Sequence, residues 1–185
     1  MKMITDQELT LEQFLNLPQD DVTYEFFNGK VTPKMFPKRF HSRLTVALCL
    51  ILEQWRENQG EVGIKWSEIL EKDGKSWAPV PDVLNISNQR LPLNRFEDEA
   101  CPFPPELVIE IISPGQTFGE LTEKATSYLE AGVDRVWVVD PKAQTITIFS
   151  FNHLPETKRK DDSLNDDLFP DLDITVGEIF QKAGW

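Results

Sequence analysis

The stretch PELVIEIISPGQTFGELTEKATSYLEAGVDRVWVVDP, residues 105–141, predicts a strand, a helix and a second strand in close succession. Branched apolar side chains fill both predicted strands, 106–112 and 135–139, as is typical of strands buried on both faces. The helix between them is expected to begin at the Thr117 and Glu120 pair, which has the spacing of a capping box. Gly132 is the residue that ends it. Because two strands joined through one helix run parallel, this stretch predicts an α/β fold.

Further elements are predicted on both sides of this unit. Residues 61–70 and 77–87 predict an antiparallel pair of strands before it, and 144–151 alternates as a hairpin partner after it. The expected architecture is α/β (α+β), with a mixed central sheet flanked by helices in one domain covering residues 1–185. Helices are predicted over 9–17, 38–58 and 176–182, and a hairpin with an Asn28-Gly29 turn over 23–32.

Several protein classes are disfavoured by simple features of the chain. The longest apolar run, residues 46–52, is far too short to span a bilayer, and the first ten residues lack the apolar segment of a signal peptide. Cys49 and Cys101 are far apart in sequence and lack metal-ligand spacing, so neither a disulfide framework nor a zinc site is expected. A cytoplasmic protein with no membrane association is therefore predicted.

The charge of the chain is strongly acidic and unevenly distributed. A net charge of −12 argues against a protein that coats nucleic acid without specificity. Residues 26–52 nevertheless contain five basic side chains and no acid, whereas residues 161–178 contain seven acids and no base. The basic segment is either an arm that meets a polyanion or an ordinary solvated loop, and the sequence leaves both interpretations open.

Glu110 is the unusual residue of the 106–112 strand, because an ionised carboxylate is costly to bury without a partner. Asp82 stands near the start of the other apolar strand, in PVPDVLNIS. Two carboxylates from neighbouring strands can share one divalent cation, since Mg²⁺ prefers oxygen ligands. The alternative is that Asp82 caps a turn after Pro81 and that Glu110 pairs with a buried lysine or arginine.

The order of these motifs resembles that of the PD-(D/E)XK nuclease superfamily, which has the restriction-endonuclease-like fold. Over residues 8–181 the chain is similar to the Uma-two family of endonucleases. The segments that carry this resemblance are YEFFNGKV (24–31), PVPDVLNIS (79–87), PELVIEIISPGQTFGELTEKATSYLEAGVDRVWVVDP (105–141) and LFPDLDITVGEIF (168–180).

The resemblance implies a metal-dependent endonuclease that hydrolyses phosphodiester bonds in DNA. Asp82 and Glu110 would hold Mg²⁺ or Mn²⁺, with the Ile111 carbonyl as a further ligand. The superfamily lysine, two residues after the strand acid, is replaced by Ile112, and the resemblance assigns its role to Lys124 on the next helix. Glu25 would support the metal ligands.

Other interpretations of these residues stay open. Lys124 has a simpler use as a partner of Glu120 four residues before it, and Glu25 could face solvent. His41 would contact a phosphate or a site water, or cap its helix as a neutral imidazole. The predicted phosphate contacts of the basic segment are Lys34, Lys38, Arg39 and Arg43.

DNA is the expected partner, and a homodimer would combine two basic segments on one substrate. The competing hypothesis is a non-catalytic nucleic-acid or protein-interaction module built on a nuclease-like fold. The endonuclease is expected to bind a divalent metal and to turn over DNA, whereas the non-catalytic module would not turn over DNA.

Overall fold

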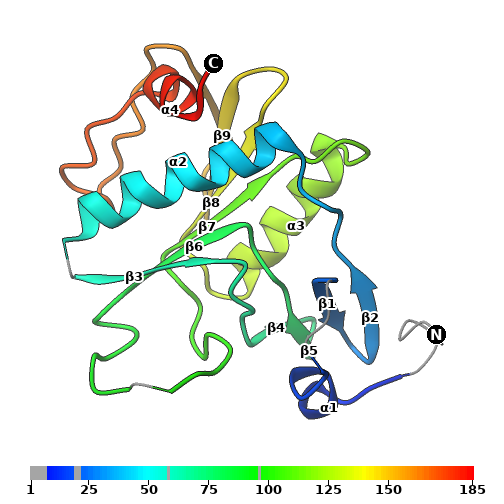
Figure 1. Cartoon of the computed structure of the whole chain (residues 1–185). Coiled ribbons are helices and arrows are strands. Elements are labelled where there is room, and N and C mark those ends of the chain that lie inside the picture. The colour runs from blue at the N-terminus through cyan, green and yellow to red at the C-terminus, as the bar shows by residue number, and fades with distance from the viewer. Residues whose placement is uncertain (1–7, 19–21, 58, 96) are drawn as a thin grey trace.

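The computed structural model describes residues 8–18, 22–57, 59–95 and 97–185. Its strands form two sheets, one with six strands in the order β10-β9-β8-β7-β6-β3 and one with four in the order β2-β1-β5-β4. Figure 1 shows helices flanking the larger sheet and the smaller sheet at one end of the molecule. The elements are α1 (Leu11–Leu15), β1 (Tyr24–Phe27), β2 (Lys30–Pro33), α2 (Arg39–Arg56), β3 (Gly60–Ile64), β4 (Leu70–Lys72), β5 (Lys75–Ala78), β6 (Val83–Ser87), β7 (Leu107–Ile111), α3 (Phe118–Glu130), β8 (Arg135–Asp140), β9 (Thr145–Ser150), β10 (Glu156–Arg159) and α4 (Val176–Ala183).

The predicted strand-helix-strand unit is confirmed. β7 and β8 are parallel, with Leu107 opposite Arg135, and β9 returns as the antiparallel partner of β8. Helix α3 begins at Thr117, whose hydroxyl accepts from the Glu120 amide while the Glu120 carboxylate accepts from the Thr117 amide. Gly132, with φ of +100°, lets the chain leave the helix in a conformation that other residues avoid.

The larger sheet is covered on both faces, so every residue of β6 and β7 is buried. Alternate side chains point to opposite faces of a strand. On β7, Leu107, Ile109 and Ile111 pack with α2 and α4, whereas Val108 packs with α3. Glu110 follows Val108 by two positions and therefore lies on the α3 side of the sheet.

Helix α2 is amphipathic, with an apolar face toward the larger sheet. Leu44, Leu48 and Leu52 are fully buried at helical spacing, whereas Val46 and Leu50 on the outer face are exposed. Within the part of the chain that the structure describes, no helix has the length and apolar character needed to cross a membrane.

The smaller sheet is built on the predicted hairpin. Asn28 and Gly29 join β1 to β2 with φ values of 45° and 86°, as a tight two-residue hairpin turn requires. β1 also pairs with β5, with Phe26 opposite Ala78. This pairing brings the hairpin to the segment that leads into Asp82.

The prediction of two long strands over 61–70 and 77–87 is wrong in part. β3 and β6 do pair antiparallel, as predicted, but each predicted strand is interrupted. Lys65 has a φ of +51°, which ends β3, and Pro79 and Pro81 lack the N–H groups that a continuous strand would donate. The pieces beyond these breaks form the β4–β5 hairpin of the smaller sheet. Asp82 therefore lies at the junction between the two sheets.

Candidate active site

Asp82 and Glu110 meet at one end of the larger sheet. β6 and β7 are antiparallel, with Val83 opposite Ile109, so Asp82 and Glu110 are the next facing positions. Both are nearly inaccessible to solvent, at 2% and 3% exposure. Two buried acids on facing positions need positive partners or hydrogen-bond donors.

One oxygen of each acid is held by groups fixed in the fold. Oδ2 of Asp82 accepts from the Ile111 amide at 2.8 Å and lies 2.9 Å from His41 Nε2. Oε1 of Glu110 accepts from the Tyr128 hydroxyl at 3.0 Å and lies 2.7 Å from the Lys124 ammonium. These partners come from α2, β7 and α3, all packed against the larger sheet, so they fix the orientation of both carboxylates.

The other oxygens of the two acids converge on Lys34. Its Nζ lies 3.2 Å from Asp82 Oδ1 and 3.4 Å from Glu110 Oε2, and it donates to the Val80 carbonyl at 2.5 Å. Glu25 Oε1 is 3.8 Å from the same nitrogen. The Lys34 ammonium thus occupies a point toward which oxygen atoms from three chain segments are directed.

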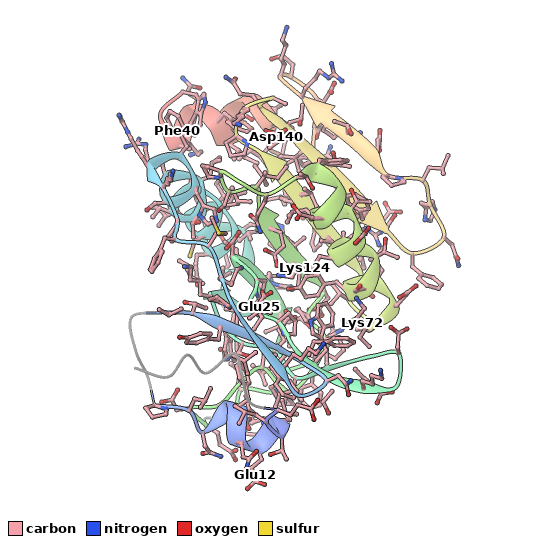
Figure 2. The ribbon with its side chains drawn as sticks, turned by 90° about the vertical axis from the view of Figure 1, so that its right-hand side faces the viewer. Glu12, Glu25, Phe40, Lys72, Lys124 and Asp140 are labelled. Atoms are coloured by element: carbon pink, nitrogen blue, oxygen red, sulfur yellow. The ribbon has the colours of Figure 1, made fainter. Side chains whose placement is uncertain are left out.

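Lys124 links Glu110 to the smaller sheet. Its ammonium lies 2.6 Å from Glu25 Oε1, which also accepts from the Val80 amide at 3.1 Å. In Figure 2 the labelled Lys124 and Glu25 lie close together near the middle of the molecule, between α3 and the smaller sheet. The alternative pairing of Lys124 with Glu120 is not seen, because the Glu120 carboxylate caps Thr117. Glu25 likewise faces the site rather than open solvent.

The charges of the site stabilise one another. Burial works to raise the pKa of Asp82, but hydrogen bonding to His41 and the charge of Lys34 outweigh it and hold that pKa well below its usual range. Burial likewise works against the ionised forms of Lys34 and Lys124, yet neighbouring carboxylates, Glu110 first among them, raise the pKa of each lysine. The pKa of Glu25 is lowered because Lys124 and Lys34 outweigh its burial. Asp82 and Glu25 are therefore ionised, and Lys34 and Lys124 are protonated, at neutral pH.

The residues predicted to contact phosphate separate into two groups. His41 is buried against Asp82, and Thr45 one turn later donates its hydroxyl to the His41 carbonyl at 3.0 Å. Arg43 reaches α4, where its guanidinium donates to the Ala183 carbonyl. Lys38 and Arg39, by contrast, are exposed at the start of α2 and form no ion pair with any described residue.

Three contributors to the site are not predicted in these roles by the sequence. Lys34 is expected to contact phosphate, but its ammonium faces the acids. Tyr128 packs in the apolar cluster beneath α3, yet its hydroxyl reaches Glu110. Its position four residues after Lys124, on the same face of the helix, is a signal that could have identified it. The Val80 carbonyl carries no sequence signal, because any residue type provides one.

Glu68 is a third buried acid close to these groups. It has no accessible surface, and neither carboxylate oxygen has a hydrogen-bond partner within the described parts of the chain. Burial, reinforced by the negative charge of Glu110, raises the pKa of Glu68 well above its usual value. A neutral carboxylic acid is therefore the form that this position favours.

Glu68→Gln is expected to stabilise the protein at neutral pH and to flatten part of its pH dependence. Because the folded pKa of Glu68 is raised, its contribution to stability is present below the unfolded pKa of about 4.3 and is lost as pH rises toward the folded pKa. Between the unfolded and the folded pKa, one such group lowers the free energy of unfolding by about 1.4 kcal/mol for each pH unit. Urea unfolding at pH 5, 6 and 7 measures the free energy of unfolding of both proteins. The advantage of the variant over the wild type should grow by about 2 kcal/mol or more between pH 5 and pH 7. Glu71→Gln, which changes an exposed acid on β4, is the matched control. If the gain in the free energy of unfolding for Glu68→Gln does not change with pH, Glu68 is not neutral in the folded protein.

The donor set suits a hard divalent cation. Among the described residues no three His, Cys, Asp or Glu side chains are grouped so that they could hold a metal ion. The candidate donors are instead two carboxylates and one backbone carbonyl: Asp82 Oδ1, Glu110 Oε2 and Val80 O, which already surround a positive charge. Oxygen ligands of this kind, completed by water, are those that Mg²⁺ and Mn²⁺ take. The Ile111 carbonyl stays a prediction as a further ligand.

Comparison with known proteins agrees with this fold. A family model described as "Uma2: Putative restriction endonuclease" matches residues 11–177. Among solved structures, a "putative nuclease belonging to DUF820" from Anabaena variabilis ATCC 29413 superposes with a TM-score of 0.80 at 22% identity, covering 95% of this chain and 99% of that one. No curated protein gives a significant sequence match. Because the family model covers nearly the whole sequence, from α1 to the start of α4, the chain belongs to the Uma2 family.

Proposed function

We propose that this protein is a metal-dependent endonuclease that hydrolyses phosphodiester bonds in DNA. The observation that carries the proposal is the convergence of Asp82 Oδ1, Glu110 Oε2 and the Val80 carbonyl on one positively charged atom. Asp82 and Glu110 would hold Mg²⁺ or Mn²⁺ through these oxygens. When bound, such an ion supplies an activated water and stabilises charge on a phosphate oxygen.

Lys124 acts as a fixed positive charge beside the acids. Because Glu110 and Glu25 raise its pKa, it stays protonated at neutral pH and does not accept a proton from water. Its ammonium can instead orient the attacking water or stabilise negative charge that develops on the phosphate. Glu25 holds Lys124 in place from the smaller sheet.

His41 and Tyr128 act as positioning residues. The His41 imidazole lies on the Asp82 oxygen that points away from Lys34, and the Tyr128 hydroxyl binds the equivalent oxygen of Glu110. Each leaves the second oxygen of its acid directed into the site. Preorganised ligands of this kind avoid the cost of ordering side chains when a cation binds.

The test is a nuclease assay of the purified protein on supercoiled, linear duplex and single-stranded DNA, with RNA for comparison. Cleavage is expected with Mg²⁺ or Mn²⁺ and should stop when EDTA is added. Absence of cleavage of every substrate, under conditions in which the protein is shown to bind Mn²⁺, would reject the endonuclease.

A second candidate function is a non-catalytic nucleic-acid or protein-interaction module. One observation favours it: Lys34 and Lys124 already neutralise much of the charge of Asp82, Glu110 and Glu25. A site of this kind can be stable as a cluster of ion pairs. Binding of DNA without turnover would identify this alternative.

Lys38 and Arg39 are the side chains that we expect to hold DNA. The segment between Lys34 and His41 lies directly beside the acids, since both of its ends contact Asp82. The Lys38→Ala/Arg39→Ala double variant should bind duplex DNA more weakly. The slope of log K against log salt should fall by about 0.9 for each phosphate that the variant no longer neutralises.

Fluorescence anisotropy at several salt concentrations measures that slope. The control is the Lys75→Ala/Lys142→Ala double variant, because both of these lysines are exposed and lie outside the segment between Lys34 and His41. Mn²⁺ affinity should not change in either double variant. If the Lys38/Arg39 variant keeps the wild-type slope, the segment is a solvated loop.

A further inference from the structure

We infer that Lys34 is a tethered counter-ion of the site, which a divalent cation must displace in order to bind. The inference rests on the proposed metal site. It adds that loading of this site requires the Lys34 side chain to leave the two carboxylates it contacts.

The contacts of the two acids show why Lys34 and a cation would compete. Asp82 and Glu110 each have one oxygen held by other groups, whereas Asp82 Oδ1 and Glu110 Oε2 contact Lys34 and no other described residue. The Val80 carbonyl, a third oxygen, also accepts from this ammonium. Since a cation would need these same oxygens, it cannot share them with Lys34.

Lys34 and Lys124 are attached to the fold in different ways. Lys124 projects from the middle of α3 and is held by two carboxylates at 2.6 and 2.7 Å. Lys34 follows the last residue of β2, and its ion pairs with the carboxylates are longer, at 3.2 to 3.8 Å, although its ammonium also donates to the Val80 carbonyl at 2.5 Å. Its backbone amide is fixed by the Thr23 carbonyl at 2.8 Å, so the side chain can rotate away while the backbone stays in place. Met35 and Phe36, which follow Lys34, are 53% and 69% exposed.

The charge of the site agrees with an exchange of this kind. The ion-pair cluster contains three carboxylate groups, those of Glu25, Asp82 and Glu110, and two ammonium groups, those of Lys34 and Lys124. Removing the Lys34 ammonium leaves an excess of two negative charges, which one divalent cation neutralises. The site can thus hold either the lysine or the metal without a large unbalanced charge.

The first test measures Mn²⁺ binding to Lys34→Met by titration calorimetry or by the loss of the free Mn²⁺ EPR signal. Because the competing ammonium is gone, the variant should bind Mn²⁺ about ten to a hundred times more tightly than the wild type, as expected for coupling between two competing cations. Lys30→Met changes an exposed lysine on β2, the strand that precedes Lys34, and should bind Mn²⁺ like the wild type. An affinity of Lys34→Met equal to or weaker than that of the wild type overturns the inference.

The second test uses the wild-type protein, so it does not depend on how the variant folds. Acetylation of each lysine is followed by mass spectrometry with and without saturating Mg²⁺. Lys34 should be protected without metal and should react several times faster with it, whereas Lys124 stays protected and Lys30 reacts rapidly under both conditions. A Lys34 rate that Mg²⁺ does not raise overturns the inference.

These outcomes separate the inference from the proposed function. If the wild type cleaves DNA with Mg²⁺ and Lys34→Met binds Mn²⁺ no more tightly, only the role of Lys34 is rejected. If Lys34→Met binds Mn²⁺ tightly and Mg²⁺ exposes Lys34, but no variant cleaves DNA, the nuclease is rejected and the displaced lysine remains.

Discussion

Asp82→Asn should abolish the binding of Mn²⁺ and reduce metal-dependent cleavage of DNA by roughly a thousandfold, the scale seen when one preorganised electrostatic group is removed from an active site. The substitution keeps the size of the side chain and one oxygen to accept from the Ile111 amide at the end of β7. The remaining NH₂ group would then face Lys34 in place of Oδ1, so the site loses both a negative charge and a metal ligand.

Three measurements check this expectation: Mn²⁺ titration, cleavage of supercoiled DNA, and the rise in melting temperature that we expect Mg²⁺ to give the wild type. Asp173→Asn, an exposed acid of the C-terminal segment, is the control and should behave like the wild type. An Asp82→Asn variant that keeps its thermal response to Mg²⁺ would place the metal somewhere else in the protein.

Lys124→Met should lose cleavage and also a large part of the stability of the fold. Two carboxylates, those of Glu25 and Glu110, contact the ammonium at 2.6 and 2.7 Å, and the lysine side chain is only 20% exposed. Breaking a buried ion pair by removing one partner typically costs 3–5 kcal/mol, so we expect a loss of about 3 kcal/mol. For a chain of this length that corresponds to a fall in melting temperature of roughly 6–12 °C.

A compensating substitution separates the two effects of Lys124. Glu25→Gln removes one of the charges that Lys124→Met leaves unpaired, and the glutamine oxygen can still accept from the Val80 amide. The double variant should therefore recover part of the lost stability without regaining cleavage. Recovery of cleavage in the double variant would show that Lys124 serves only to hold the fold together.

Local sequence rules are sufficient for most of the elements. The β7-α3-β8 unit is predicted correctly because its capping residues and glycine mark both ends of the helix, and branched residues mark the strands. The β1–β2 hairpin is predicted from two residues, Asn28 and Gly29, that adopt the positive φ values of the turn. In these places the local preference and the tertiary structure agree.

The division into two sheets is not predictable in the same way. The segment 61–70 alternates like one strand, yet Lys65 adopts a left-handed conformation that its side chain does not favour. Beyond the break, Glu68 bridges to Cys101 and Leu70 pairs with Trp77 of β5, so the chain passes from one sheet to the other within the predicted strand. A pattern of apolar residues reports which face is buried but not which sheet buries it.

Prediction of the site from the sequence is limited in the same way. Family resemblance points to Asp82, Glu110, Lys124 and Glu25, and the structure brings these four side chains together, although their chemical roles stay predictions. The acid-free run of residues 26–52 suggests that Lys34 faces a phosphate. The two carboxylates to which Lys34 donates lie 48 and 76 positions further along the chain, and no local pattern carries that information.

The junction between the two sheets also bears on how such a protein changes over generations. The larger sheet supplies Glu110 from the buried strand β7, and Asp82 directly precedes the buried strand β6, so substitution at either position disturbs the core. The smaller sheet supplies Glu25, and Lys34 follows it in an irregular segment, where a new side chain displaces no apolar packing. A single codon change at position 34 would therefore alter the charge of the site without replacing a residue of the apolar core, so we expect related genes to diverge in the proposed metal affinity faster than in fold.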